Sequence, residues 1–139
     1  MSALLSLLWY FPHVVAFALG FLVLAVASFY LLWILYLAVM NLQRARDNGT
    51  ITPAAYRLGL PLLYVGLLVD CLVNVIPVSA LFLELPREFL VTQRLTRHAN
   101  AEGGWRKGLA IWFAKNLLDT FDPSGQHVRI LVDQRPDRR

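Results

Sequence analysis

Apolar side chains dominate the first part of this chain, and charged side chains are confined to the part after it. Residues 1–43 contain no Asp, Glu, Lys or Arg, and Arg44 is the first charged side chain. A soluble domain of 139 residues has too small a core to bury such a run, whereas about 20 apolar residues in a helix span a bilayer. The pattern therefore predicts a membrane-spanning helix near the N-terminus.

The first helix is predicted over about residues 12–43. Proline is tolerated in a first helical turn, which places the start near Pro12. At 1.5 Å per residue such a helix would be roughly 48 Å long. It would exceed the hydrocarbon thickness of about 30 Å, and we expect it to tilt or to project beyond the membrane.

A second apolar helix is predicted over about residues 53–85. The dipeptide Asn48-Gly49 indicates a turn before it. Thr52 followed by Pro53 is typical of a helix N-cap with proline in the first turn. Residues 1–85 are therefore expected to form a membrane region that contains a two-helix transmembrane hairpin.

Residues 86–139 are expected to form a short basic tail in the cytoplasm. Helices are predicted over about 86–98 and 105–118, with a loop between them and an Asp122-Pro123-Ser124-Gly125 turn after the second. The expected fold class is an all-α membrane protein, a transmembrane hairpin followed by a basic helical C-terminal tail.

Composition and charge support a lipid partner. The chain is 58% hydrophobic and only 16% charged, against about 25% charged in ordinary soluble domains. The formal net charge is +4, and a basic tail beside a span favours anionic lipid headgroups. No recognisable nucleic-acid motif is present, so no nucleic-acid partner is expected.

The basic residues also predict an orientation, because they favour the cytoplasmic side. None precedes the first helix, whereas three flank the loop and five lie in the proximal tail. With two full spans, the tail decides and both termini are cytoplasmic. A re-entrant second segment would place loop and tail in one compartment, and all the charges would agree. Two spans are favoured, because this segment lacks a Gly-rich turn and irregular backbone is prohibitive in lipid.

Two polar residues interrupt the second apolar segment. Asp70 lies near its middle, and Asn74 lies one helical turn further on the same face. A carboxylate at the bilayer centre costs about 2.5–3.5 kcal/mol, so this intramembrane polar stripe should face protein. An oligomer contact, a proton site or a pore lining would use it. The alternative is a structural hydrogen bond between the two helices of one chain.

Two features of the tail suggest contact with a membrane surface. Arg87, Arg94 and Arg97 would share one side of a helix and form a headgroup-facing basic stripe, or an ordinary solvated face. The second predicted tail helix carries an apolar stripe that would either lie on the membrane or pack against helix 86–98. Its members are Trp105, Leu109, Trp112, Phe113 and Leu117.

No catalytic motif is present. His98, Asp119, Asp122 and His127 could supply metal ligands, but none of their spacings matches a recognised metal motif. No phosphate loop or nucleophile elbow occurs. We therefore expect no enzyme activity, no cofactor and no metal, and a membrane-bound enzyme that uses these residues is disfavoured.

Three stretches resemble small integral membrane proteins encoded by tailed bacteriophages and prophages. They are residues 81–95 (LFLELPREFLVTQRL), Gly104-Trp105-Arg106 and residues 117–127 (LLDTFDPSGQH), and the likeness covers about residues 58–127. The family pattern has Pro at the position of Thr120 and Cys at that of Val128, which argues against a metal or thiol site at the turn. The resemblance implies a bacterial inner-membrane location and a phage origin, with no established activity.

The sequence therefore predicts a phage or prophage protein of the host inner membrane that acts non-enzymatically, with superinfection exclusion as its role. Its expected partners are the bilayer, a second copy of the chain, or a host or phage membrane protein. The alternative is a holin-like, pore-forming lysis protein, in which Asp70 and Asn74 would line an oligomeric lesion.

Overall fold

The computed structural model describes residues 2–122, 124 and 127–130 of the chain. Within these residues every regular element is a helix, and the two longest are the apolar helices that the sequence predicts. The elements are α1 (Ser2–Asp47), α2 (Pro53–Val75), α3 (Pro77–Phe82), α4 (Val91–Ala99), α5 (Trp105–Phe113) and the π-helical turn η1 (Ala114–Leu118).

α1 is a single helix of 46 residues, roughly 69 Å long at 1.5 Å per residue. It extends beyond the predicted range of 12–43 at both ends and continues through Pro12. One proline removes only one backbone N–H, and the apolar residues on both sides of it continue the helix.

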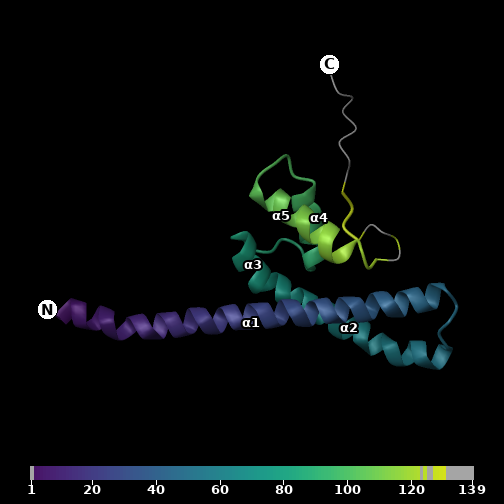
Figure 1. Ribbon diagram of the computed structural model, residues 1–139, viewed down its shortest axis with the longest axis horizontal. Helices are drawn as coiled ribbons and strands as arrows, with labels where there is room; N and C mark the ends of the chain where they lie inside the picture. Colours follow the sequence, from purple (N-terminus) through teal and green to yellow (C-terminus); the bar gives the residue numbers. More distant parts are fainter. Residues whose placement is uncertain (1, 123, 125–126, 131–139) are drawn as a thin grey trace, which may run out of the picture.

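α2 runs antiparallel beside the C-terminal half of α1 (Figure 1). The turn between them has Gly49 at φ 65°, and the Thr52 hydroxyl accepts the Ala55 N–H at 3.2 Å as an N-cap. Gly59 permits the close approach of the helices, because a Cβ there would lie 2.8 Å from Leu42. The predicted hairpin of two apolar helices is therefore present.

The second apolar segment is not one helix, as the range of 53–85 implied, but two. α2 ends at Val75, and Pro77 opens α3 after a break at Ile76 (φ −100°, ψ −79°). Pro77 lacks an N–H and its ring crowds the preceding turn, which explains the break. α3 ends at Phe82, after which Leu83 adopts a left-handed conformation with φ 49°.

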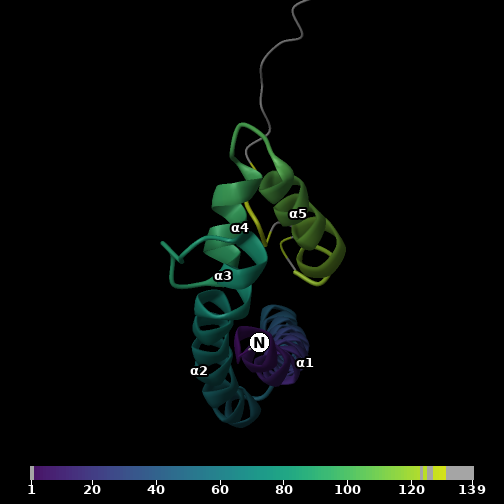
Figure 2. The same cartoon turned by 90° about the vertical axis from the view of Figure 1, so that its left-hand side faces the viewer.

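The tail folds back along α1 (Figures 1 and 2). The residues of α1 that it contacts lie between 29 and 44, which span about 23 Å. The tail therefore covers most of the length of the hairpin. The contacts are the stacked rings of Phe29 and Phe113 at 6.4 Å, the Trp33 and Phe121 rings at 6.2 Å, the Tyr36 hydroxyl donating to Leu118 O at 2.5 Å, and Arg44 Nη2 donating to Phe121 O at 3.1 Å.

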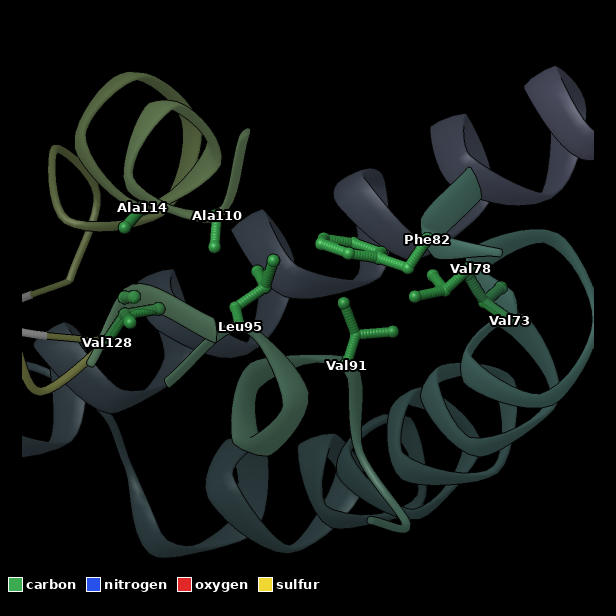
Figure 3. Packing of buried hydrophobic residues seen from close by; sticks show 9 residues of the cluster. Val73, Val78, Phe82, Val91, Leu95, Ala110, Ala114 and Val128 are labelled. Carbon is green, nitrogen blue, oxygen red and sulfur yellow. The ribbon is translucent and has the colours of Figure 1, made fainter. Parts of the chain in front are cut away.

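The core lies where α2, α3, α4 and α5 meet. Figure 3 shows Phe82 among the buried apolar side chains, and it has no exposed surface. The His98 ring stacks on it with the ring centres 4.7 Å apart. The predicted apolar stripe of the second tail helix is divided by this packing: Leu109 and Phe113 pack against the core, while Trp105 and Trp112 stay about half exposed. The other buried members are Val73, Val78, Val91, Leu95, Ala99, Ala110, Ala114 and Val128.

Most of the N-terminal half of α1 projects beyond the other described helices, and only its last residues, among them Phe21 and Leu24, lie beside the end of α2 across an apolar groove. Every side chain from Trp9 to Leu24 is exposed, and burial begins only at Ala25. Figure 1 shows this half of the helix extending alone beyond the rest of the molecule. The molecule thus consists of a lone apolar helix and a helical body formed by residues 25–130.

Candidate functional site

The most unusual side chain of the body is Arg94, on α4, which has no exposed surface. Its Nη1 donates to Asn74 O at 3.1 Å, to Asn74 Oδ1 at 3.2 Å and to Ser79 Oγ at 3.2 Å. Its Nη2 donates to Glu84 O at 2.5 Å. A buried charge is costly unless hydrogen-bonded, and these bonds tie α4 to the end of α2, to α3 and to the residues after α3.

Asn74 is also fully buried. Its Nδ2 donates to Glu88 O at 2.5 Å, while its carbonyl O also accepts the Ser79 hydroxyl at 3.1 Å. Asn74 therefore joins the end of α2 to the segment between α3 and α4. Its bonds lie inside one chain and link α2 to the tail.

Asp70 lies one turn earlier on α2 and caps α4. Its Oδ1 accepts the Val91 N–H at 3.0 Å, and Val91 is the first residue of that helix. The first N–H groups of a helix lack partners within it and attract negative charge. The predicted polar stripe of Asp70 and Asn74 thus faces protein, but its partner is the tail and not α1.

A second layer of charge covers the buried Arg94. Arg97 forms ion pairs with both Glu84 and Glu88. Burial alone would raise the pKa of each carboxyl, but the hydrogen bond and positive charge of Arg97 outweigh it and lower both pKa values. The two arginines and two glutamates balance in charge, so the cluster presents no net charge to a ligand.

His98 completes the cluster beneath Phe82. The side chain is only 4% exposed, and its Nε2 lies 3.9 Å from Glu84 Oε2. Burial lowers the pKa of His98, and the neighbouring Arg97 lowers it further. The ring is therefore favoured in its neutral form inside the core.

The predicted basic stripe of Arg87, Arg94 and Arg97 is not a common surface. The helix predicted from residue 86 begins only at Val91, so Arg87 lies outside it. Arg87 is exposed, Arg94 is buried and Arg97 is occupied by glutamates. A headgroup-facing role is therefore wrong for Arg94, because its guanidinium satisfies backbone and side-chain oxygens inside the fold.

The acidic and histidine residues of the tail fall into separate places. Asp122 accepts the Ser124 N–H at 2.7 Å and contacts His127 Nδ1 at 3.1 Å, while Pro123 and Gly125 of the predicted turn lie outside the described residues. Asp119 Oδ1 accepts the Val128 N–H at 3.3 Å, while His98 lies in the core. Among the described residues, no three His, Cys, Asp or Glu side chains could hold one metal ion.

Sequence reasoning did not single out Ser79, Glu84, Glu88 and Tyr36, which complete this arrangement. A signal existed for the glutamates, because two acids four residues apart precede the arginines and can pair with them. The cluster of Asn74, Ser79, Glu84, Glu88, Arg94, Arg97 and His98 is here called the lock. Its charges balance and its hydrogen bonds join separate elements, while Glu88 Oε2, Arg94 Nε and His98 Nε2 are buried without a hydrogen-bond partner among the described residues. Its role is structural: it holds the tail against the hairpin.

We expect replacement of Arg94 by methionine to destabilise the body by about 3 kcal/mol, because hydrogen bonds to a charged group contribute about 1.5–3 kcal/mol and their partners would remain buried. The measurement is a urea titration of the detergent-solubilised protein followed by tryptophan fluorescence. The matched control, Arg57→Met, alters an exposed arginine and should change the unfolding free energy by less than about 0.5 kcal/mol. Equal effects of the two variants would contradict the lock.

The cluster also predicts loss of stability in acid. Because the pKa of His98 is lowered from 6.5, the unfolded chain takes up its proton first, and stability falls as the pH drops below about 6.5. The lowered pKa values of Glu84 and Glu88 add a second loss below their usual 4.5, as the folded carboxylates become protonated.

Melting temperatures measured by circular dichroism across this pH range test both steps. His98→Gln should remove the first loss and retain the second. Glu84→Gln should weaken the second loss and enlarge the first, because the Glu84 carboxylate raises the pKa of His98. A His98→Gln profile that coincides with the wild-type profile would refute the assignment of the first step.

No known protein family, no curated protein and no solved structure matches this chain. The likeness to phage membrane proteins therefore rests on the three sequence stretches alone.

Proposed function

We propose that the chain is a non-enzymatic integral membrane protein, anchored by the N-terminal half of α1, whose body lies on one side of the bilayer and acts through contacts with lipid and other membrane proteins. The observation that supports this proposal is the lone apolar helix. Residues 9–24 are exposed throughout and contain no Asp, Glu, Lys or Arg. With residues 2–8 they give a helix of roughly 34 Å, long enough for a hydrocarbon core of about 30 Å.

The position of the tail supports a single span. A bilayer centred on the hairpin would enclose the tail too, because the tail lies along residues 29–44 of α1. Exposed charged residues of the tail, such as Glu102 and Lys115, would then lie at hydrocarbon depth. Each would cost up to about 2.5–3.5 kcal/mol at the bilayer centre, a cost that the single span avoids.

The distribution of charge agrees with this arrangement. All 13 Lys and Arg residues follow residue 43. With one span, loop and tail share a compartment, and every positive charge near the membrane favours the cytoplasm. This proposal places the N-terminus outside, in contrast to the arrangement with both termini in the cytoplasm that two spans imply.

One observation favours the two-span alternative. The outward face of α2 exposes large apolar side chains, among them Leu58, Tyr64 and Leu68, and lipid would cover them in a spanning hairpin. That arrangement requires the tail to leave α1 and to give up the contacts of Tyr36 and Arg44. The two topologies therefore differ in which side of the membrane holds the hairpin turn.

Cysteine accessibility separates the two topologies. Cys71, the single cysteine of the sequence, is first replaced by serine. In this Cys71→Ser background, Thr50→Cys marks the hairpin turn and Glu102→Cys marks the tail. We expect a membrane-impermeant maleimide to label neither site in intact bacterial spheroplasts and both after lysis, while external protease removes an N-terminal epitope tag. Labelling of Thr50→Cys from outside, with the tag protected, would replace the single span by two.

The biological role that we propose is superinfection exclusion in a bacterial inner membrane, which rests on the resemblance to phage proteins. The holin alternative needs Asp70 and Asn74 free to line a lesion. Both side chains are instead bonded within the chain, to Val91 and Glu88. This internal use supports a role through surface contacts over a role through a pore.

Controlled expression in a bacterial host tests that role. We expect normal growth and membrane potential, a block in phage DNA entry, and retention of that block in Asp70→Asn, which keeps an acceptor for the Val91 N–H. Abrupt depolarisation that Asp70→Asn abolishes would establish the pore instead. Normal growth with unimpeded phage entry would contradict the exclusion role.

A further inference from the structure

The segment between α3 and α4, residues 83–90 and here called the strap, has its polarity reversed. Leu83, Leu85 and Phe89 are 76%, 81% and 80% exposed. The acidic residues between them, Glu84 and Glu88, turn inward and pair with Arg97. In a loop that faced only water, the charges would point outward and the apolar side chains inward.

The reversal follows from the lock. The carboxylates of Glu84 and Glu88 face Arg97. Their backbone carbonyls also accept hydrogen bonds, Glu84 O from Arg94 and Glu88 O from Asn74. Exposure alternates along the strap: residues 83, 85, 87 and 89 are exposed, whereas residues 84, 86, 88 and 90 are partly buried. The positions next to the inward-facing glutamates therefore point outward. Exposed apolar clusters of this kind mark contact sites for membranes or proteins.

The place of the strap in the fold selects the membrane. A half-open apolar groove of about 220 Å³ lies between α1 and the end of α2, and its lining includes Phe21, Leu24, Ile76 and Pro77. Phe21 and Leu24 are where the lone part of α1 ends, and Pro77 begins α3. Figure 1 shows α3, and with it the start of the strap, at the end of the body from which the lone helix departs. A bilayer around the lone helix therefore has its surface at the level of the strap.

Charge and aromatic residues at this end fit a lipid surface. Arg87 is exposed between Leu85 and Phe89, within reach of phosphate groups when those side chains insert. Trp105 is half exposed, and the Arg106 guanidinium lies 5.1 Å from its ring centre. Tryptophan concentrates at membrane interfaces, and Arg106 Nε also donates to Phe82 O at 2.8 Å, which holds the start of the strap.

We infer that the strap is a membrane-interface anchor, in which Leu83, Leu85 and Phe89 enter the headgroup–acyl boundary and Arg87 binds the phosphate of anionic lipids. This inference rests on the proposed single span, because that span sets the level of the membrane surface. It adds a second point of attachment, which fixes the body against the bilayer instead of leaving it to rotate around α1.

The test uses the full-length protein with Cys71→Ser in proteoliposomes of phosphatidylcholine, with or without phosphatidylglycerol. An environment-sensitive fluorophore is attached at one of three introduced cysteines: Leu85→Cys in the strap, Leu19→Cys in the lone helix and Thr50→Cys at the hairpin turn. Lipids that carry a quencher near the headgroup or deep in the acyl chain report the depth of each probe. All three positions are exposed, so the substitutions should leave the fold intact, as circular dichroism can verify.

We expect the Leu85→Cys probe to be quenched by the shallow quencher, the Leu19→Cys probe by the deep quencher and the Thr50→Cys probe by neither. A Leu19→Cys probe quenched at depth beside a Leu85→Cys probe that stays in water would overturn the strap and leave the span standing. A Leu19→Cys probe that no lipid quencher reaches would overturn the span itself. A Leu85→Cys probe shielded from both water and lipid would show that protein covers the strap, which also overturns the inference.

Arg87→Gln tests the lipid charge. A basic side chain near an anionic surface contributes about 1 kcal/mol, so this variant should reduce insertion of the Leu85→Cys probe about five-fold in vesicles with phosphatidylglycerol. It should have little effect in phosphatidylcholine alone. The control Arg57→Gln, near the hairpin turn, should change neither value. Equal insertion with and without Arg87 would overturn the assignment of the lipid contact.

Discussion

The arrangement of this protein depends on the burial of one guanidinium group. Arg94 can be desolvated only where enough oxygens surround it, and these come from α2, from α3 and from the segment that follows α3. Satisfying it fixes α4 against the hairpin and leads α5 and η1 back along α1. The tail then lies along α1 from residue 29 onward and does not cover the N-terminal half of that helix. In the proposed arrangement, the position of the bilayer would therefore follow from a hydrogen-bond network that lies outside the lone helix.

The sequence predicts the helical elements well because their signals are local. The absence of charge before Arg44, the Asn48-Gly49 turn and the Thr52-Pro53 start are sufficient for the hairpin, and each is present in the structure. Boundaries that depend on tertiary contacts are less predictable. The residues before Val91 have an acceptable helical pattern, but their backbone carbonyls bind Arg94 and Asn74, and an additional helical turn would remove those acceptors.

The candidate site could be predicted only in part, for the same reason. Asp70 and Asn74 stand out because a polar pair in an apolar segment requires a protein partner, but the identity of the partner depends on how the chain returns. The spacing of Arg94 and Arg97 places them on one helix face, but in the structure their side chains have different partners. One binds oxygens in the interior, and the other binds glutamates in the strap. Side-chain spacing on a helix defines a face, whereas the environment of that face is a property of the whole fold.

Hydropathy does not distinguish an apolar helix that faces lipid from one that packs against protein, because it measures the composition of a helix and not the elements that surround it. Both long helices are apolar enough, yet the described side chains in the first half of α1 are all exposed, whereas α2 contacts both α1 and the tail. The reversed polarity of the strap follows from the same lock, since glutamates that turn inward toward Arg97 drive leucine and phenylalanine outward. The network neutralises its own charges and leaves apolar residues of the strap exposed, which is the basis of the proposed lipid contact. A pore would need the opposite arrangement, with polar groups free to meet water, and in this fold those groups are committed to holding the tail.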